Sequence, residues 1–313
     1  KTFVLGGLNV DLSSTTDQVT TFNGSANAVV QKGFENINAS GVGGSFGAQI
    51  TAISTGSKIT GTANADVING GAGADTIIID AGTVGNSDIM NGGAGTDTLS
   101  IAAGLTATID GDTDLVNVEN VTFVAAGEVN LTGQTEALTI TGSTDVVNTI
   151  TGGSGADTIV LGTDTGTSGD DHINIASAVD FGDTITGFLA GATSDALDIF
   201  DPSVAIAASY TKGNAASLDF GTNGIIAINQ NVAAADATMT PAEVETAAVT
   251  AFDNIGANEK SYIALSTDYD SALVDVYIYL ATANAGGTDI ASVALVAVLD
   301  NVELDNLHQN NFV

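Results

Sequence analysis

Short stretches in which apolar and polar residues alternate recur along most of the chain. Ile59, Leu99 and Ile185, for example, each lie between two polar residues. Alternation of this kind predicts β-strands with one face buried and one face in solvent. Thr, Val, Ile, Gly, Asn and Asp are abundant, a composition that favours strands joined by tight turns. We therefore expect a mainly β fold.

One helix is predicted near residue 240. Thr240 can cap its N-terminus, Pro241 suits the first turn, and Glu243 completes a capping box. Apolar residues then follow at helical spacing over 244–252, and Gly256 ends the pattern.

Strands are predicted on both sides of this helix. One lies at 225–228 before it, and three follow at about 261–266, 273–281 and 290–299. Because turn residues separate the last three, we expect an antiparallel meander. The sequence pattern changes between Ile185 and Ile199, and we expect this stretch to form a cap that closes the stack of strands.

A nine-residue motif recurs in the first two thirds of the chain. Residues 70–78, 92–100 and 152–160 all fit the pattern G-G-x-G-x-D-x-U-x, in which U is a large aliphatic residue. Weaker copies begin at Gly61, Thr83 and Gly166, and Asp183 and Ile185 keep the offset between the Asp and the aliphatic residue. Repeats of this length predict a solenoid built of short strands and turns.

The spacing of the Asp residues predicts how they stack. Asp66 and Asp75 are nine residues apart, so they should lie on opposite sides of a two-sided coil. Asp88 follows Asp66 at the same interval at which Asp97 follows Asp75. Both pairs should therefore stack one coil apart, with an insertion near 81–84.

The loops have the chemistry of a calcium site. Glycine tolerates positive φ, so the backbone can curl and direct carbonyls inward, while each Asp presents a carboxylate. Oxygen ligands of this kind suit Ca²⁺. The chain has 37 Asp and Glu against five Lys, no Arg and a net charge of −32. Stacked carboxylates repel one another, so we expect loops that are ordered only with calcium.

The three full copies resemble the calcium-binding RTX repeats of proteins exported by type I systems of Gram-negative bacteria. The resemblance covers residues 59–100 and 143–199 and implies a parallel β-roll with several Ca²⁺ ions between adjacent turns. It implies carboxylate ligands at Asp75, Asp97 and Asp157. It implies backbone carbonyl ligands at Gly71, Gly73, Gly93, Gly95, Gly153 and Gly155. Asp66, Asp88, Asp171 and Asp183 are further candidates in loops that depart from the motif.

We expect three segments in the chain. Residues 1–58 are predicted to be solenoid-like, 59–200 to form the calcium-binding solenoid, and 201–313 to form a β-rich C-terminal cap. The end of the cap, from Leu299 to Val313, resembles the uncleaved type I export signal of the same class, and an ordinary last strand with a frayed end is the alternative.

Composition argues against several other functions. The acidic balance disfavours binding to nucleic acid or to an anionic membrane, and no apolar stretch has the length of a bilayer span. The chain has no Cys and two His, and it lacks the H-E-x-x-H motif and the G-x-S-x-G motif. The absence of Trp and Arg disfavours a glycosidase or a polysaccharide lyase. We therefore expect no enzymatic activity.

The function expected from these observations is structural. The chain is similar to the surface-layer proteins of Gram-negative bacteria, which implies a secreted protein of the cell surface. Self-association into a lattice or filament, the type I secretion machinery and cell-surface polysaccharide are its expected partners. The alternatives are the C-terminal RTX segment of a large adhesin and the export tail of a secreted enzyme.

Overall fold

The computed structural model describes much of the chain in two compact units, residues 1–143 and 144–313. The residues described are 9–11, 21–22, 25–26, 36–41, 47–52, 55–80, 88–164, 169–177, 180–190, 199–201, 210–213, 225–228, 231–233, 235–247, 257–268, 270–271 and 274–312. The predicted insertion at 81–84 and the predicted end of the helix, from 248 to Gly256, lie outside them.

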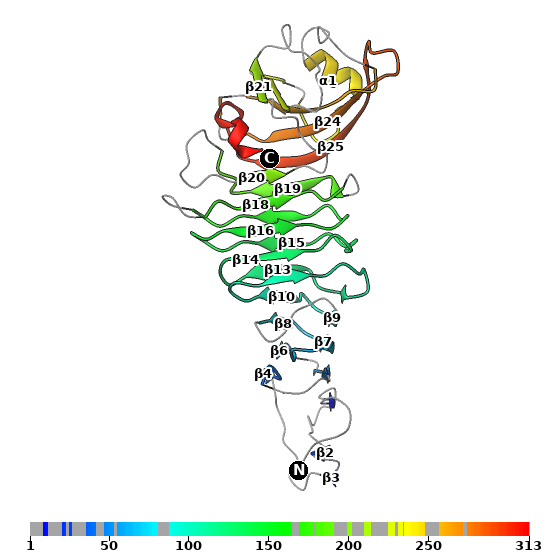
Figure 1. The fold of residues 1–313 in the computed structure, drawn as a ribbon, viewed down its shortest axis with the longest axis vertical. Coiled ribbons are helices and arrows are strands. Elements are labelled where there is room, and N and C mark those ends of the chain that lie inside the picture. Colours follow the sequence, from blue (N-terminus) through cyan, green and yellow to red (C-terminus); the bar gives the residue numbers. More distant parts are fainter. Residues whose placement is uncertain are drawn as a thin grey trace. The chain divides into compact units, whose positions relative to one another are not determined.

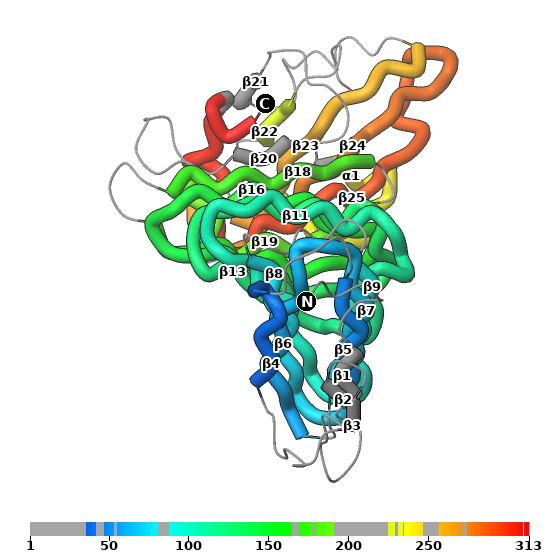
Figure 2. The backbone as a smooth tube through the Cα atoms, turned by 60° about the horizontal axis from the view of Figure 1, so that its bottom comes forward, coloured from blue at the N-terminus to red at the C-terminus, as the bar shows by residue number. Residues whose placement is uncertain are grey.

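Parallel strands stack in register in the unit 1–143 and form two walls of a β-solenoid (Figure 1). The first wall contains β1 (Asn9–Asp11), β5 (Gln49–Thr51), β7 (Val67–Ala72), β9 (Ile89–Ala94) and β12 (Leu115–Val116). The second contains β4 (Asn36–Asn38), β6 (Lys58–Thr60), β8 (Thr76–Ile79), β10 (Thr98–Ile101), β13 (Asn120–Phe123) and β15 (Thr139–Thr141). Figure 2 shows β4 and β6 facing β5 and β7 across the coil.

Two shorter strand pairs complete this unit. The strands β11 (Thr106–Thr108) and β14 (Gly127–Asn130) pair in parallel. The strands β2 (Thr21–Phe22) and β3 (Ser25–Ala26) form an antiparallel pair.

A column of aliphatic side chains fills the coil behind the second wall. Ile59, Ile77, Leu99 and Val121 occupy the same register position on successive strands, and each is at most 1% exposed. On β8, β10 and β13 the residues that flank this column are more exposed than the column itself, as the alternation of the sequence predicts. Strict alternation fixes the register, because a shift of one residue would turn this column out to solvent.

The unit 144–313 begins with further solenoid strands. The strands β16 (Asn148–Thr151), β18 (His172–Asn174) and β20 (Ile199–Asp201) are parallel neighbours. On another wall, β17 (Thr158–Val160) pairs in parallel with β19 (Asp183–Thr186). The predicted fold class, a parallel β-solenoid with C-terminal antiparallel strands and a short helix, is therefore confirmed.

The predicted meander is present and is joined directly to the solenoid. The strands β23 (Lys260–Ser266), β24 (Val276–Ala283) and β25 (Ile290–Asp300) are antiparallel. The end of β25 also pairs in parallel with β19, so Asp183 lies beside Ala297. On the other side, β22 (Ile225–Ile228) and β21 (Tyr210–Gly213) extend the sheet in parallel with β23.

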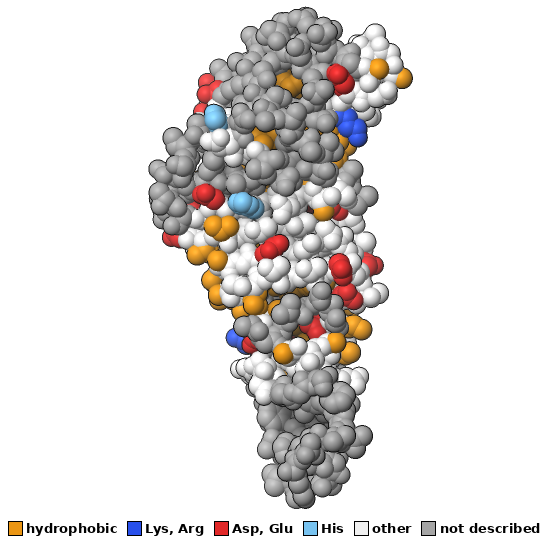
Figure 3. Space-filling model, viewed as in Figure 1, with side chains coloured by type: hydrophobic (Ala, Val, Ile, Leu, Met, Phe, Trp, Pro, Cys, Tyr) orange, Lys and Arg blue, Asp and Glu red, His pale blue; other side chains and the backbone are white. Residues whose placement is uncertain are grey.

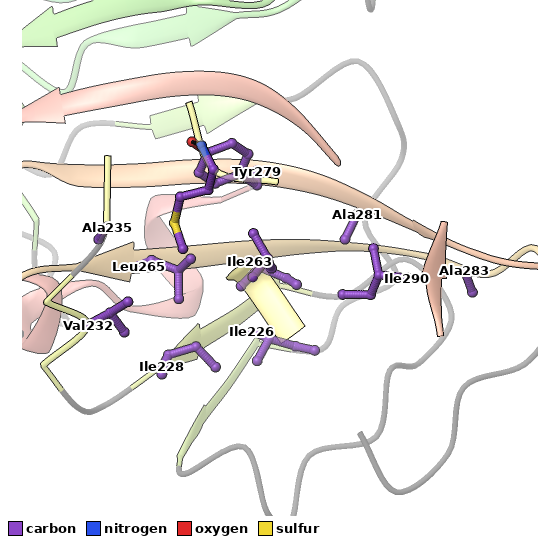
Figure 4. Packing of buried hydrophobic residues seen from close by; sticks show 12 residues of the cluster. Ile226, Ile228, Val232, Ala235, Ile263, Leu265, Tyr279, Ala281, Ala283 and Ile290 are labelled. Atoms are coloured by element: carbon purple, nitrogen blue, oxygen red, sulfur yellow. Dashed lines mark hydrogen bonds between the residues drawn. The ribbon is translucent and has the colours of Figure 1, made fainter. Parts of the chain in front are cut away.

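An apolar core of its own supports this C-terminal sheet (Figure 4). Ile228, Ile263 and Leu265 are completely buried in it. The hydroxyl of Tyr279 donates to the carbonyl of Asp236 and accepts the amide of Met239.

The predicted capping box is present at the start of α1 (Pro241–Ala247). The amide of Thr240 donates to Oε2 of Glu243 at 2.7 Å, and the amide of Glu243 donates to Oγ1 of Thr240 at 3.4 Å. This reciprocal pair satisfies two backbone amides at the helix N-terminus.

The described end of the chain packs against the protein. After β25 it forms two short 3₁₀ helices, η3 (Leu304–Asn306) and η4 (Gln309–Asn311). Leu304 and Asn311 are completely buried, and the side-chain amide of Asn311 donates to the carbonyl of Leu189 at 3.3 Å. The export signal expected in this segment stays a prediction.

Candidate metal centre

The Asp residues stack as their spacing predicts. Asp66 directly precedes β7 on the first wall, and Asp75 directly precedes β8 on the second. The registers of β7 with β9 and of β8 with β10 place Asp88 and Asp97 one turn further along the same walls. The prediction that both pairs stack one coil apart is thus confirmed.

Each stacked carboxylate accepts a backbone amide from the preceding turn. In the first stack, Oδ1 of Asp66 accepts the amide of Ala48 at 2.6 Å, and Oδ1 of Asp88 accepts that of Asp66 at 2.7 Å. In the second, Oδ1 of Asp75 accepts the amide of Ser57 at 2.6 Å, and Oδ1 of Asp97 accepts that of Asp75 at 2.7 Å. One oxygen of each carboxylate therefore ties neighbouring turns together.

The same ladder occurs in the unit 144–313. Oδ1 of Asp183 accepts the amide of Asp157 at 2.9 Å, and Oδ1 of Asp171 accepts the amide of Asn148 at 2.6 Å. Asp171 and Asp183 are completely buried, and Asp157 is 2% exposed. The intervals between the bonded residues are longer here than in the unit 1–143, yet the amide-to-carboxylate contact is the same.

The second oxygen of several ladder carboxylates has no hydrogen-bond partner. Oδ2 of Asp75, Asp97 and Asp183 is buried without one. A buried acceptor without a partner costs on the order of 1–3 kcal/mol, and more when it is charged. Such an oxygen is either protonated or bound to a cation, so each of these three positions fits a metal ligand.

Burial raises the pKa of these side chains. Desolvation is the largest cause, the amide hydrogen bond opposes it, and the neighbouring carboxylate adds to it. The pKa is raised to about 6 for Asp88, about 7 for Asp171 and about 8 for Asp183. The pKa values of Asp75 and Asp97 are raised for the same reasons. Burial therefore disfavours the free charged form at each of these sites, and a bound cation would offset that cost.

The predicted glycines shape the turns of the unit 1–143. Gly71, Gly73, Gly93 and Gly95 all have positive φ, between 103° and 144°. Successive turns approach closely here, because a Cβ atom at Gly93 would lie 2.0 Å from the carbonyl oxygen of Gly71. The predicted carbonyl donors are therefore stacked one above another, and their role as calcium ligands stays a prediction.

Carboxylate and carbonyl oxygens of neighbouring turns pack closely around two glycines beside the ladder. A Cβ atom at Gly70 would lie 2.4 Å from the carbonyl oxygen of Gly92 and 2.6 Å from Oδ2 of Asp75. A Cβ atom at Gly92 would lie 2.1 Å from the carbonyl oxygen of Asn117 and 2.5 Å from Oδ2 of Asp97. At each glycine, a carboxylate oxygen and a carbonyl of the next turn thus lie on the same side of the backbone. The motif did not single out Gly92 or Asn117 as donors.

Other predicted ligands have different surroundings. Oδ2 of Asp66 accepts the amide of Thr62 at 2.6 Å, and its Oδ1 also accepts the hydroxyl of Thr62 at 2.8 Å. Oδ2 of Asp157 accepts the amide of Gly153 at 3.0 Å. Gly153 and Gly155 are buried in the turn between β16 and β17. Asp66 is consequently the least suited of the predicted carboxylates to bind a metal ion.

Glu119 continues the second ladder, although no nonapeptide contains it. Its Oε2 accepts the amide of Asp97 at 2.7 Å, the place that an Asp occupies on earlier turns. Glu119 follows Asp97 at the same interval at which Asp97 follows Asp75. That interval was the signal that could have identified it.

The donor set suits Ca²⁺ if backbone oxygens take part. Within the described residues, no three His, Asp or Glu side chains are grouped so that they could hold a metal ion. Ca²⁺ accepts six to eight oxygen ligands in flexible geometry, and backbone carbonyls are among its usual donors. One or two carboxylates from adjacent turns, completed by carbonyls and water, therefore match this ion.

Comparison with known proteins agrees with this chemistry. No curated protein and no solved structure matches the chain. The profile of the RTX calcium-binding nonapeptide repeat, which spans four copies, matches residues 57–83, 85–100 and 147–167. Repeats of this family bind Ca²⁺ and are typical of secreted proteins. No helix in the described residues is long and apolar enough to cross a bilayer. Over these three segments, the chain is similar to the RTX calcium-binding nonapeptide repeat.

Proposed function

We propose that the chain is a secreted structural protein whose solenoid folds on calcium and then associates into an extracellular surface layer. The observation that carries the proposal is the row of buried carboxylates in which Oδ2 of Asp75, Asp97 and Asp183 has no hydrogen-bond partner. The role proposed for these residues is structural rather than catalytic.

Calcium supplies the driving force for folding. Successive strands of a sheet are about 4.8 Å apart. Two unit charges at that distance repel by roughly 1 kcal/mol in water and by about 3.5 kcal/mol at an effective dielectric constant of 20. A divalent cation between two turns converts this repulsion into attraction. Its binding free energy adds to stability, since the unfolded chain holds no such site.

The charge of the surface supports calcium-dependent association. With a net charge of −32, two copies repel each other at low ionic strength. Acidic side chains are more widespread than those of lysine on the face drawn in Figure 3. Calcium ions held between acidic turns of neighbouring copies would remove that repulsion.

The outer face of the second wall is a candidate contact between copies. Outward positions in one register column carry Thr76, Thr98, Asn120 and Thr139. Lys58 on β6 occupies the same column, and none of these side chains is acidic, so a second copy meets no carboxylate along it.

Electron microscopy of the purified chain tests the proposal, in millimolar calcium and then in excess chelator. Ordered sheets or filaments that form only with calcium are the expected result. The variant Asp97→Asn should need more calcium to assemble, whereas Asp110→Asn, which alters an exposed carboxylate, should assemble as the parent does. Single compact particles at all calcium concentrations would contradict assembly. That result would favour the adhesin segment or the export tail of an enzyme.

A further inference from the structure

Two of the nonapeptides begin directly after an asparagine, so each forms an Asn-Gly pair. The sequence contains four such pairs, of which Asn69-Gly70 and Asn91-Gly92 lie in the described residues. The first pair is within β7 and the second within β9, and the register places Asn69 beside Asn91 on neighbouring turns. Both asparagines are partly exposed, whereas both glycines are buried. Water can therefore reach the two side-chain amides.

An Asn-Gly pair can lose ammonia without the help of another side chain. The backbone nitrogen of the glycine attacks Cγ of the asparagine, the new C–N bond closes a five-membered succinimide, and the bond from Cγ to the side-chain nitrogen breaks. The proton of the glycine amide goes to this leaving group, which departs as ammonia. Water then opens the ring at either carbonyl and gives Asp or isoaspartate. Glycine favours the attack, because it has no side chain that hinders the nitrogen.

The folded turn requires the glycine of each pair but not the asparagine. A Cβ atom at Gly70 would lie 2.6 Å from Oδ2 of Asp75. In the third full copy of the motif, a Cβ atom at Gly152 would lie equally close, 2.6 Å from Oδ2 of Asp157. There, however, Thr151 precedes the glycine. The close approach of the turns thus excludes any side chain that would slow the reaction, while the asparagine can be replaced.

Strand pairing on both sides opposes ring closure in the folded chain. The strand β7 lies between β5 and β9, and β9 lies between β7 and β12. An extended residue of a parallel sheet has a ψ of about +115°. To close the ring, ψ must rotate until the next nitrogen eclipses Cβ. The carbonyl of Asn69 accepts the amide of Ala52 at 2.8 Å, and Oδ1 of Asn91 accepts the side-chain amide of Asn117 at 2.9 Å. Both hydrogen bonds hold the asparagines in the unreactive geometry.

We propose that Asn69 and Asn91 are modification sites whose deamidation is controlled by calcium. This inference rests on the calcium-dependent folding proposed above, but not on assembly into a surface layer. Calcium keeps β7 and β9 paired, whereas the metal-free solenoid opens and frees the backbone of both pairs. Deamidation to Asp then places two carboxylates at paired positions of neighbouring turns, where they repel each other. Isoaspartate adds an atom to the backbone and disturbs the strand register. A prolonged loss of calcium thereby becomes irreversible.

Peptide mass spectrometry of the full chain tests the inference after incubation in millimolar calcium, in excess chelator and in urea. Each deamidation raises the mass, because a hydroxyl group replaces an amino group. In urea, all four Asn-Gly pairs of the sequence should react at similar rates. At Asn69 and Asn91, the rate in calcium should be at least about tenfold lower than in chelator, because the reaction requires an opened strand. The fraction of chain that refolds when calcium is restored, measured by circular dichroism, should fall as deamidation proceeds.

Threonine substitutions link the modification to the loss of refolding. Asn69→Thr and Asn91→Thr give each pair the residue that precedes Gly152 in the third copy. The double variant should still refold with calcium after an incubation in chelator that leaves the parent unable to do so. The control is Asn120→Thr, because Asn120 is also partly exposed but is followed by Val121, whose side chain hinders ring closure. This variant should lose its ability to refold as the parent does.

The same measurements separate a failure of this inference from a failure of calcium-dependent folding. Equal deamidation rates in calcium and in chelator, with the solenoid unfolded in chelator, would overturn the inference. If the solenoid stays folded in chelator, calcium-dependent folding fails instead. Faster deamidation in urea than in the folded chain would then keep Asn69 and Asn91 as modification sites that folding protects, and equal rates would overturn them.

Discussion

The backbone amide of Asp75 donates a 2.7 Å hydrogen bond to Oδ1 of Asp97, one turn further along the solenoid. The side chain of Asp97 therefore performs two tasks. One oxygen joins the turns, and the other is left for a cation. In the metal-free protein, each ladder Asp thus stabilises the stack of turns through its hydrogen bond and destabilises it through the buried negative charge. A bound cation removes the second effect.

Replacing Asp97 with Asn separates these two tasks. The Asn side chain keeps an oxygen that accepts the Asp75 amide, but it carries no charge and is a weaker calcium ligand. We expect Asp97→Asn to melt at a higher temperature than the parent in excess chelator and to gain less from calcium. At calcium concentrations of about 100 times the dissociation constant, the loss of one site removes roughly 2.7 kcal/mol of stabilisation. Differential scanning calorimetry with and without calcium measures both effects.

The exposed residue Asp110 supplies the control for this experiment. Asp110→Asn removes the same charge without altering a ladder position, so its calcium-induced shift in melting temperature should match that of the parent. An equal shift in Asp97→Asn and the parent would show that Asp97 binds no calcium.

The metal-free protein should lose stability as pH rises. Burial raises the folded-state pKa to about 6 for Asp88, about 7 for Asp171 and about 8 for Asp183. An unfolded Asp titrates near 3.9, so between about pH 4 and pH 8 the folded state binds more protons than the unfolded state. Stability is therefore highest below about pH 4 with respect to these groups, and it falls as pH rises through their folded pKa values. Each unit of pKa difference corresponds to about 1.4 kcal/mol.

Urea unfolding in metal-depleted buffer at pH 5 and pH 8.5 measures this dependence. We expect a lower midpoint at pH 8.5. In millimolar calcium the order should reverse, because protons compete with Ca²⁺ for the same oxygens. A higher midpoint at pH 8.5 without calcium would mean that the buried carboxylates do not control stability.

Three glycine-to-alanine substitutions distinguish two costs to the free energy of unfolding: a steric clash with the neighbouring turn and a strained positive φ. Gly93 has a φ of +103° and lies against the carbonyl of Gly71, so Gly93→Ala should cost more than about 2 kcal/mol. Gly104 has a φ of +74° with open space around it, so Gly104→Ala should cost about 1 kcal/mol. Gly41→Ala, also in open space, should change stability little. Equal losses at Gly93 and Gly104, measured by urea unfolding in calcium, would contradict close stacking of the turns.

Much of the fold follows from local patterns in the sequence. The nonapeptide specifies both a turn and the strand that follows it. Asp66 and Asp88 are separated by the same number of residues as Asp75 and Asp97. This number is the length of one coil, so Asp88 lies one turn beyond Asp66. The meander and the capping box at Thr240 also depend on neighbouring residues. By contrast, the parallel pairing of β19 with β25 joins residues more than one hundred positions apart, and no local periodicity indicates such a contact.

The candidate metal site was only partly predictable, because the role of each carboxylate oxygen depends on contacts with other turns. The motif identifies Asp75 and Asp97 as carboxylates of a turn, but it does not show that Oδ1 is used for a backbone amide and Oδ2 is left over.

Glu119 allows a test of where the second ladder ends. Its Oε2 accepts the amide of Asp97 at 2.7 Å, and its side chain is exposed, in contrast to the buried Asp97. Glu119→Ala leaves the Asp97 amide without this acceptor, which should cost about 1–2 kcal/mol of unfolding free energy. Glu119→Gln keeps an acceptor oxygen of the same reach, so it should cost about 0.5 kcal/mol or less.

Urea unfolding of both variants in calcium measures the difference. Asp110→Ala, which removes an exposed carboxylate outside the ladder, supplies the control and should resemble the parent. If Glu119 is instead a strong calcium ligand, Glu119→Gln should lose as much calcium-dependent stability as Glu119→Ala. A near-neutral Glu119→Gln beside a destabilised Glu119→Ala would show that the ladder ends in a hydrogen bond: Glu119 takes over the structural task of the Asp residues without their buried charge.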